Sequence, residues 1–287
     1  MRHTPNYLTS PKLTFDRDGG RLIAVEAEAV EIVDLARHET VRIDHPEACA
    51  TLGFADQIWV ASQDEALYRY TPTGTPIGEP IVLPFAEHPM LVPAPCGPAT
   101  GVWGDVALHA EGIGAQLVRT ALPPADLALP ITHRHFAISA WRRLLLPSGI
   151  ATPFDAPITG GAVLDNGSEA AIVLGSGAVR ELALVALDDG QITTRIAVPP
   201  GLVRIAKRRG IVVVLTDPMT LVAIDLRMGT VLGTMQLAHP TRDIAIDPQG
   251  RCIALRGAGV QLLALDDLLQ RSTTMTQPVF RRVARVA

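Results

Sequence analysis

A strand–turn–strand unit recurs along this chain, and the recurrence limits the possible folds more than any other feature of the sequence. Residues 13–25 contain an apolar segment, a turn rich in Asp and Gly, and a second apolar segment. The pattern returns at residues 244–255 and, more loosely, at residues 162–174. Asp, Asn and Gly suit these turns because tight turns need positive φ angles and bonds from side chains to the backbone. The repeat therefore predicts a series of antiparallel hairpins.

Two more strands are expected after each hairpin. The third strand ends in an acidic residue, a pattern seen in residues 30–35, 184–188, 221–226 and 262–266. The fourth strand is more polar, and in residues 191–198 the even-numbered side chains can face inward while Arg195 faces outward. Apolar inner strands with a half-polar outer strand are expected when a four-stranded sheet packs between two others.

Histidines indicate the period of the repeat. His45, His88 and His133 are 43 and 45 residues apart, each just after an expected outer strand, and His239 has the same phase. A period of ~40–45 residues is typical of a β-propeller blade, and this chain has room for about seven blades. The expected units are residues 12–44, 45–86, 87–130, 131–158, 159–199, 200–238 and 239–267. Because the fourth unit is short and irregular, six blades are the alternative.

The sequence predicts an all-β, single-domain β-propeller over residues 1–287. The helices that an α/β fold places between successive strands are missing from the pattern, and only residues 265–271 are expected to form a short helix. The last unit supplies three strands, so a terminal segment, either 3–9 or 279–286, should add the outer one and close the ring. Residues 268–287 are accordingly a closing strand or a tail.

Composition and charge exclude several classes of protein. Hydrophobic residues make up 48% of the chain, which provides enough material for a core and excludes disorder. The longest aliphatic runs, such as residues 211–215, are far shorter than the ~20 residues that span a bilayer, so no membrane insertion is expected. The net charge is only −4 and aromatic residues make up 4% of the chain, so nucleic acid is not an expected partner.

Cysteine usage and the start of the chain predict a cytoplasmic protein. Residues 1–7 lack the apolar stretch that follows the charge in a secretory signal. Cys49, Cys96 and Cys252 are widely spaced, which is typical of neither a disulfide framework nor a zinc site. No cofactor is expected, because the paired glycines of this chain lack the third glycine and the following helix of a dinucleotide site. These glycine pairs occur at residues 112–114, 175–177 and 257–259.

Two segments resemble known propeller repeats. Residues 239–250, with a histidine before the first strand and an acidic-Pro-x-Gly turn, resemble the opening of a WD-repeat blade, although no Trp-Asp dipeptide follows. Residues 224–231 are similar to the end of a bacterial YVTN-type repeat. Propellers of this kind serve mostly as docking platforms and less often as lactonases or other enzymes. The resemblance therefore implies a bacterial protein that binds other proteins, although a fold alone does not decide a function.

Candidate binding residues come from the loops of one expected face. His45, His88 and His133 lie in the expected connections between blades, and His135 is a further candidate. Their imidazoles either ligate zinc, copper or nickel or orient the loops through backbone bonds. Turns between second and third strands, together with nearby arginines, add charged groups: Asp64, Glu65, Asp217, Arg242 and Arg256. Such groups are either simply solvated or part of a polar docking rim.

These features predict a non-catalytic scaffold that binds another protein within a bacterial cytoplasmic assembly. The sequence contains many loops on a rigid fold but no convergent catalytic set. Two alternatives belong to other classes. One is a metal-dependent hydrolase or lactonase with its site at the axial mouth, and the other is a sensor that binds a small molecule in the central channel.

Overall fold

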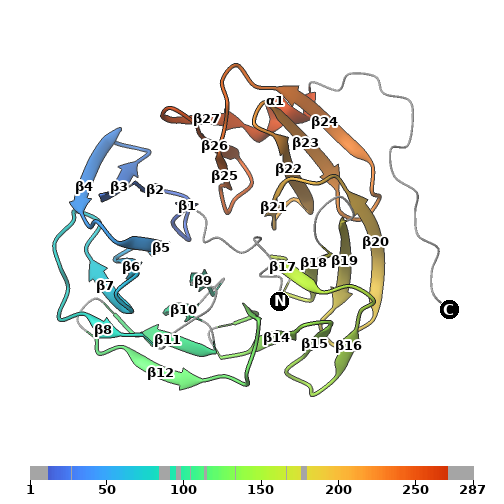
Figure 1. The fold of residues 1–287 in the computed structure, drawn as a ribbon, viewed down its shortest axis with the longest axis horizontal. Coiled ribbons are helices and arrows are strands. Elements are labelled where there is room, and N and C mark those ends of the chain that lie inside the picture. Colours follow the sequence, from blue (N-terminus) through green and yellow to red (C-terminus); the bar gives the residue numbers. More distant parts are fainter. Residues whose placement is uncertain are drawn as a thin grey trace, which may run out of the picture. The chain divides into compact units, whose positions relative to one another are not determined.

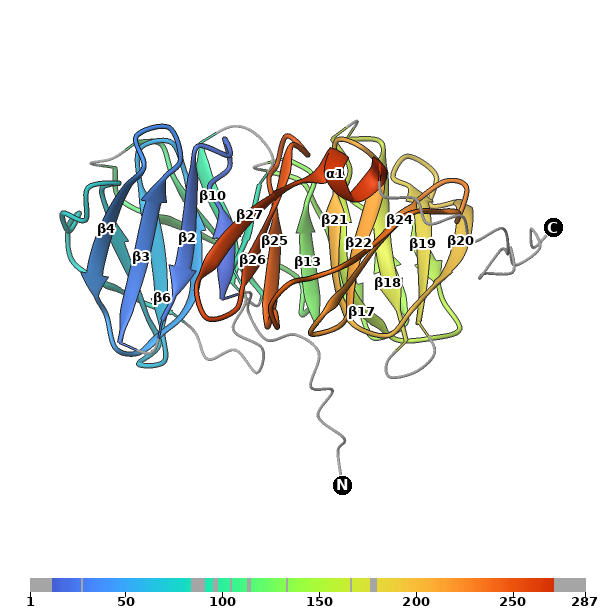
Figure 2. The same ribbon diagram turned by 90° about the horizontal axis from the view of Figure 1, so that it is seen from above.

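The computed structural model describes residues 12–270, except for 27, 84–90, 95–97, 104, 113–114, 133, 166 and 176–179. These residues divide into two compact units with a boundary between Ile138 and Ser139. We call them the N-terminal unit and the C-terminal unit and describe each by itself. The secondary structure is β-strand apart from one short helix (Figures 1 and 2).

The first three sheets belong to the N-terminal unit. They contain β1 (Leu13–Phe15), β2 (Arg21–Val25), β3 (Ala29–Asp34) and β4 (Glu39–Asp44); β5 (Ala48–Gly53), β6 (Ile58–Ser62), β7 (Ala66–Tyr70) and β8 (Ile81–Val82); and β9 (Leu91–Pro93), β10 (Ala99–Trp103), β11 (Val106–Ala110) and β12 (Val118–Ala121). The fourth sheet includes the boundary between the units and contains β13 (Leu127–Pro130), β14 (Phe136–Ala140), β15 (Arg143–Leu145) and β16 (Ala151–Pro153).

The last three sheets and the helix belong to the C-terminal unit. They contain β17 (Ile158–Val163), β18 (Glu169–Leu174), β19 (Arg180–Ala186) and β20 (Ile192–Val198); β21 (Leu202–Ala206), β22 (Ile211–Asp217), β23 (Thr220–Asp225) and β24 (Val231–Gln236); and β25 (Asp243–Ile246), β26 (Cys252–Arg256) and β27 (Val260–Ala264). The helix α1 (Leu265–Gln270) follows β27 directly and confirms the short helix expected at residues 265–271.

Strands that are neighbours in a sheet are also neighbours in the sequence. Seven successive antiparallel sheets of this kind form a β-propeller with seven blades, so the all-β fold is confirmed and the six-blade alternative is wrong. The seventh sheet has three strands in the part of the chain that the structure describes. Both expected closing segments, 3–9 and 279–286, lie outside the described residues. Of residues 268–287, the first three belong to α1.

One boundary between blades differs from the expectation. Residues 127–130 were expected to end the third unit, but they form β13, the inner strand of a complete fourth sheet. All four residues of β13 are buried, as an inner strand requires, whereas all four residues of β12, the true outer strand of the third sheet, are exposed. The fourth blade is therefore a complete four-stranded sheet, although it is short, with three residues in each of β15 and β16.

The repeated Asp and Arg in the sequence hold the turn of the hairpin. Asp16 is buried, and its carboxylate accepts hydrogen bonds from the backbone N and the Nη1 of Arg21, at 3.1 and 3.3 Å. Asp247 is buried too and accepts bonds from the backbone N, the Nε and the Nη2 of Arg251, at 3.0, 2.7 and 3.0 Å. Gly250, between them, has a φ of 68°. The sequence repeat therefore encodes a turn whose donors are satisfied by one carboxylate.

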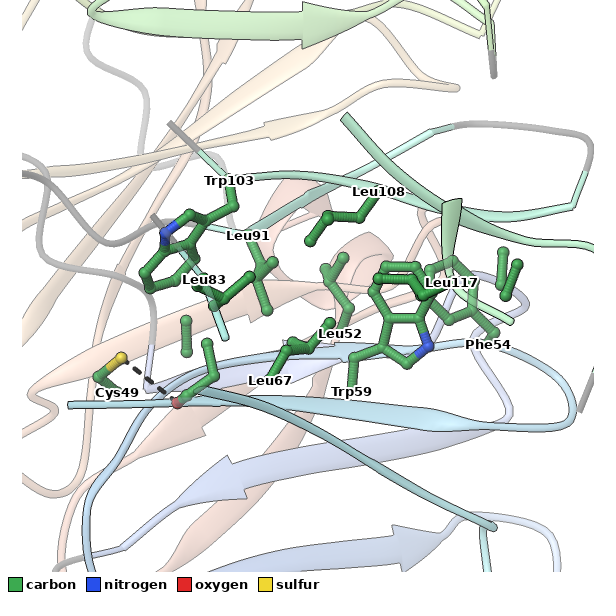
Figure 3. Close-up of a cluster of buried hydrophobic side chains, with 14 residues drawn as sticks. Cys49, Leu52, Phe54, Trp59, Leu67, Leu83, Leu91, Trp103, Leu108 and Leu117 are labelled. Atoms are coloured by element: carbon green, nitrogen blue, oxygen red, sulfur yellow. Dashed lines mark hydrogen bonds between the residues drawn. The ribbon is translucent and has the colours of Figure 1, made fainter. Parts of the chain in front are cut away.

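Apolar faces of adjacent sheets pack against each other. Between the second and third sheets, Trp59 and Leu67 face Trp103 and Leu108, as Figure 3 shows. The indole N–H of Trp59 donates to Oε1 of Gln57 at 2.9 Å, so the buried ring leaves no unpaired donor. In the C-terminal unit, similar clusters join the fifth sheet to the sixth and the sixth to the seventh. Each sheet is thus buried on the faces that contact its neighbours.

The helix α1 lies against the sixth sheet. Leu265 and Leu268 are fully buried in the cluster between the sixth and seventh sheets, and Figure 1 shows α1 beside β24. A Cβ atom at Gly233 would overlap the carbonyl oxygen of Leu268, so the absence of a side chain at this position lets the helix approach β24. No helix in the described part of the chain has the length and apolar character needed to cross a membrane.

Truncating Leu67 tests the packing between sheets. This side chain is 0% exposed, so we expect Leu67→Ala to lower the free energy of unfolding by about 2–5 kcal/mol through lost burial and a cavity. Leu262 is 52% exposed, and Leu262→Ala is expected to change it by less than about 0.5 kcal/mol. Urea unfolding measures both. Equal losses for the two variants would contradict the assigned core.

Candidate functional site

Two kinds of loop lie at the same end of each sheet. Neighbouring strands are antiparallel, so the first strand of a sheet starts at the end where the second strand finishes. The connection from the outer strand of the preceding sheet and the turn between the second and third strands therefore lie at that same end. In the N-terminal unit, Gln63 N donates to Glu47 O at 2.9 Å and joins the β6–β7 turn to the β4–β5 connection. In the C-terminal unit, Thr241 N donates to Pro218 O at 2.7 Å and joins the β24–β25 connection to the β22–β23 turn. We call this the connection end of the sheets.

In the N-terminal unit, the connection end holds His45 in a cluster with two tyrosines. His45 is 8% exposed; its ring lies 4.5 Å from that of Tyr68, edge to face, and its Nδ1 lies 3.3 Å from the hydroxyl of Tyr70. The Tyr68 hydroxyl donates to Oδ2 of Asp64 at 2.9 Å. The structure therefore brings two predicted site residues, His45 and Asp64, to one place, with Tyr68 between them.

Burial controls the charge of this cluster. Burial lowers the pKa of His45 below its usual value, and the nearby carboxylates of Asp64 and Glu47 oppose this effect in part. The hydrogen bond to Asp64 raises the pKa of Tyr68, and burial raises the pKa of Tyr70. At neutral pH the cluster therefore contains a neutral imidazole. Its Nε2 is buried and has no hydrogen-bond partner among the described residues.

In the C-terminal unit, the connection end holds the other predicted charged residues. Asp217 is exposed, and a hydrogen bond from the backbone N of Met219, at 2.7 Å, is the main cause that lowers the pKa of its carboxyl. Arg242 is also exposed, and its backbone N donates to the carbonyl of Arg256 at 2.7 Å. Asp217, Arg242 and Arg256 therefore share one end of the sixth and seventh sheets, as the strand pattern predicted.

Two of the three predicted histidines, His88 and His133, lie outside the described residues, so their convergence with His45 stays a prediction. The segment around His133 was expected to connect two blades, and this assignment is wrong. Residues 131–132 and 134–135 belong to the turn between β13 and β14, which is at the opposite end from the connection end. His135 is exposed, and its Nδ1 lies 3.1 Å from the hydroxyl of Thr132 in the same turn.

Metal-ligating groups are not gathered in the described part of the chain. No group of three or more His, Cys, Asp or Glu side chains lies there in a position to hold a metal ion. The neighbours of His45 are aromatic rings, and the carboxylate of Asp64 is bonded to a tyrosine hydroxyl. The described groups around His45 are held to one another by hydrogen bonds and ring contacts.

Sequence reasoning missed one residue, Trp141. It forms the turn between β14 and β15 with Arg142, its side chain is 66% exposed, and its φ is 52°. Bulky residues rarely adopt this left-handed conformation. The turn is held rigidly because Ile158 N donates to the carbonyl of Trp141 and Phe154 N to that of Arg142, each at 2.8 Å. The signal available in the sequence was a two-residue turn without Gly, Asn or Asp. Recognising this turn required the correct position of β13.

Comparisons with known proteins show the fold and nothing finer. No protein-family model matches the chain, and no curated protein matches its sequence. Kluyveromyces lactis Hsv2 with its complete loop 6CD has a TM-score of 0.57 at 12% identity, covering 88% of this chain and 98% of that one. The variant of that protein whose loop 6CD is replaced by a Gly-Ser linker has a TM-score of 0.56 at 13% identity, with the same coverage. These similar structures are β-propellers.

Lowering the pH tests the environment of His45. Unfolded histidine takes up a proton near pH ~6.5, but the folded pKa is lower, so the unfolded state binds more protons as the pH falls through this value. We expect the stability advantage of the wild type over His45→Asn to be constant above pH ~6.5. Below that it should shrink by up to about 1.4 kcal/mol per pH unit. Urea unfolding of both proteins between about pH 8 and about pH 5 measures this difference. A difference that grows on acidification would show that the folded state favours the charged imidazole.

Proposed function

We propose that this protein is a non-catalytic scaffold that binds another protein at the connection end of its sheets, within a bacterial cytoplasmic assembly. The observation that carries the proposal is the exposed indole of Trp141 on a rigid turn. Tryptophan and arginine are enriched among the residues that contribute most to protein binding, and Arg142 is exposed beside Trp141. A turn whose backbone is already held in place loses little conformational freedom when a partner binds.

Polar groups at the connection end support the same proposal. In the C-terminal unit, exposed Asp217 and Arg242 offer charges of both signs, and Arg256 is half-buried beside them. Polar, partly exposed residues of this kind typically surround the buried centre of a protein interface. Propellers also commonly act as interaction platforms, although this general property does not identify a partner.

The proposed cytoplasmic location rests on the two described cysteines. Cys49 is buried and Cys252 half-buried, and both are free thiols. Burial raises the pKa of each thiol, so both stay protonated and unreactive. Free, buried thiols are compatible with a reducing compartment. The bacterial source rests on the resemblance of residues 224–231 to a bacterial repeat.

Affinity capture with matched variants tests the role of Trp141. Immobilised wild type should retain a specific partner from a lysate of the source cells, and Trp141→Ala should weaken that interaction by about 30-fold or more, equivalent to the ~2 kcal/mol typical of a central interface residue. The control is Val82→Ala, which removes a side chain of 70% exposure on β8. Equal retention by both variants would contradict the proposed docking site.

A further inference from the structure

Arg69 is the one lysine or arginine that the structure places among the buried residues of the described chain. Its side chain is 9% exposed and projects from β7. Residues two positions apart on a strand face the same side, so Arg69 shares the face of Leu67, which packs against the third sheet. The guanidinium Nη1 reaches that sheet and donates to the carbonyl of Ala115 at 2.8 Å. A charged group therefore lies beside an apolar core.

The hydrogen bonds of Arg69 do not satisfy its guanidinium. The group has five N–H donors, and only the bond to Ala115 is present among the described residues. The Nε atom is buried without a partner in the same part of the chain. No described carboxylate is paired with Arg69, whereas Arg204 pairs with Asp243 at 2.9 Å and Arg251 with Asp247 at 2.7 Å. Buried charges are normally paired, because removing them from water is costly.

The buried donor without a partner, Nε, shares one edge of the guanidinium with Nη2, and the N–H groups of these two atoms point in the same direction. A Cβ atom at Gly78 would lie 3.4 Å from Nη2, so the turn that contains this glycine lies next to that edge. Its φ of 66° also favours glycine at this position in the turn after β7. Glu79, the next residue, is exposed. The edge of the guanidinium that binds oxyanions in a bidentate manner therefore has no hydrogen-bond partner among the described residues.

We propose that Arg69 binds a small oxyanion, a carboxylate or phosphate group, through Nε and Nη2. Two parallel charge-assisted hydrogen bonds would satisfy the buried Nε and neutralise the charge. The site is formed by β7, the turn at Gly78 and the carbonyl of Ala115, all in the N-terminal unit. It is separate from the proposed docking residues and does not depend on the proposed function.

Thermal unfolding in different anions tests this site. We expect the Tm of the wild type to rise with phosphate or formate, compared with sodium chloride of equal ionic strength. The rise should reach roughly 5–10 °C when the anion is about 100-fold above its Kd, and should continue to grow with the logarithm of the anion concentration. Arg69→Met should abolish this response and, in chloride, should be at least as stable as the wild type, because the unpaired charge is gone. Arg119→Met, at an exposed position on β12, is the matched control and should keep the full response.

Three results would overturn the proposal. The first is a wild-type Tm that responds no more to phosphate or formate than to chloride. The second is an anion response that persists in Arg69→Met, and the third is a strong loss of stability of that variant in chloride. Arg69→Lys is a second variant, which keeps the charge without the bidentate edge and should show a weakened response. A response to phosphate but not to phenyl phosphate indicates a free ion, and a response to both indicates a group carried by a larger ligand.

Discussion

Burial of apolar surface between adjacent sheets is the interaction on which the rest of this structure depends. A four-stranded sheet whose inner strands are apolar on both faces cannot shield itself, so it needs a neighbour on each side. Trp59 and Leu67 show this arrangement between the second and third sheets. Because the strands are held by packing along their whole length, the loops at their ends have fixed positions. A turn such as that of Trp141 can then keep an unfavourable conformation, since the surrounding backbone bonds hold it.

The sequence predicted the fold where the repeat has a local physical cause. Asp16 and Asp247 each satisfy the donors of their own hairpin turn, so the same residue types recur at the same places and can be recognised without the structure. The prediction failed around residues 127–130 because the preceding outer strands carry little signal. The strand β8 has two residues, and every residue of β12 is exposed. Without a recognisable outer strand, the next inner strand was assigned to the wrong blade, and so was the segment around His133.

The candidate site, like the fold, was predicted from the sequence only in part. Strand order alone placed Asp217, Arg242 and Arg256 at one end of two sheets, because the direction of each strand follows from its position in the repeat. What strand order does not provide is the environment of a side chain. The burial of His45, in the connection between the first and second sheets, depends on Tyr68 and Tyr70 of β7. That Arg69 has no carboxylate partner among the described residues is visible only after the neighbouring sheet is in place. Both features arise from tertiary packing.

The close approach of α1 to β24 at Gly233 has a practical consequence for work with this protein. The helix follows the seventh sheet in the chain, but its buried leucines pack it against the sixth sheet. Gln270, the last residue of the helix, therefore lies beside a sheet that ended about thirty residues earlier in the chain. A fluorophore or affinity handle attached after Gln270 therefore starts from the sixth sheet. Distances measured from such a label report on that position, and a side chain introduced at residue 233 would displace the attachment point itself.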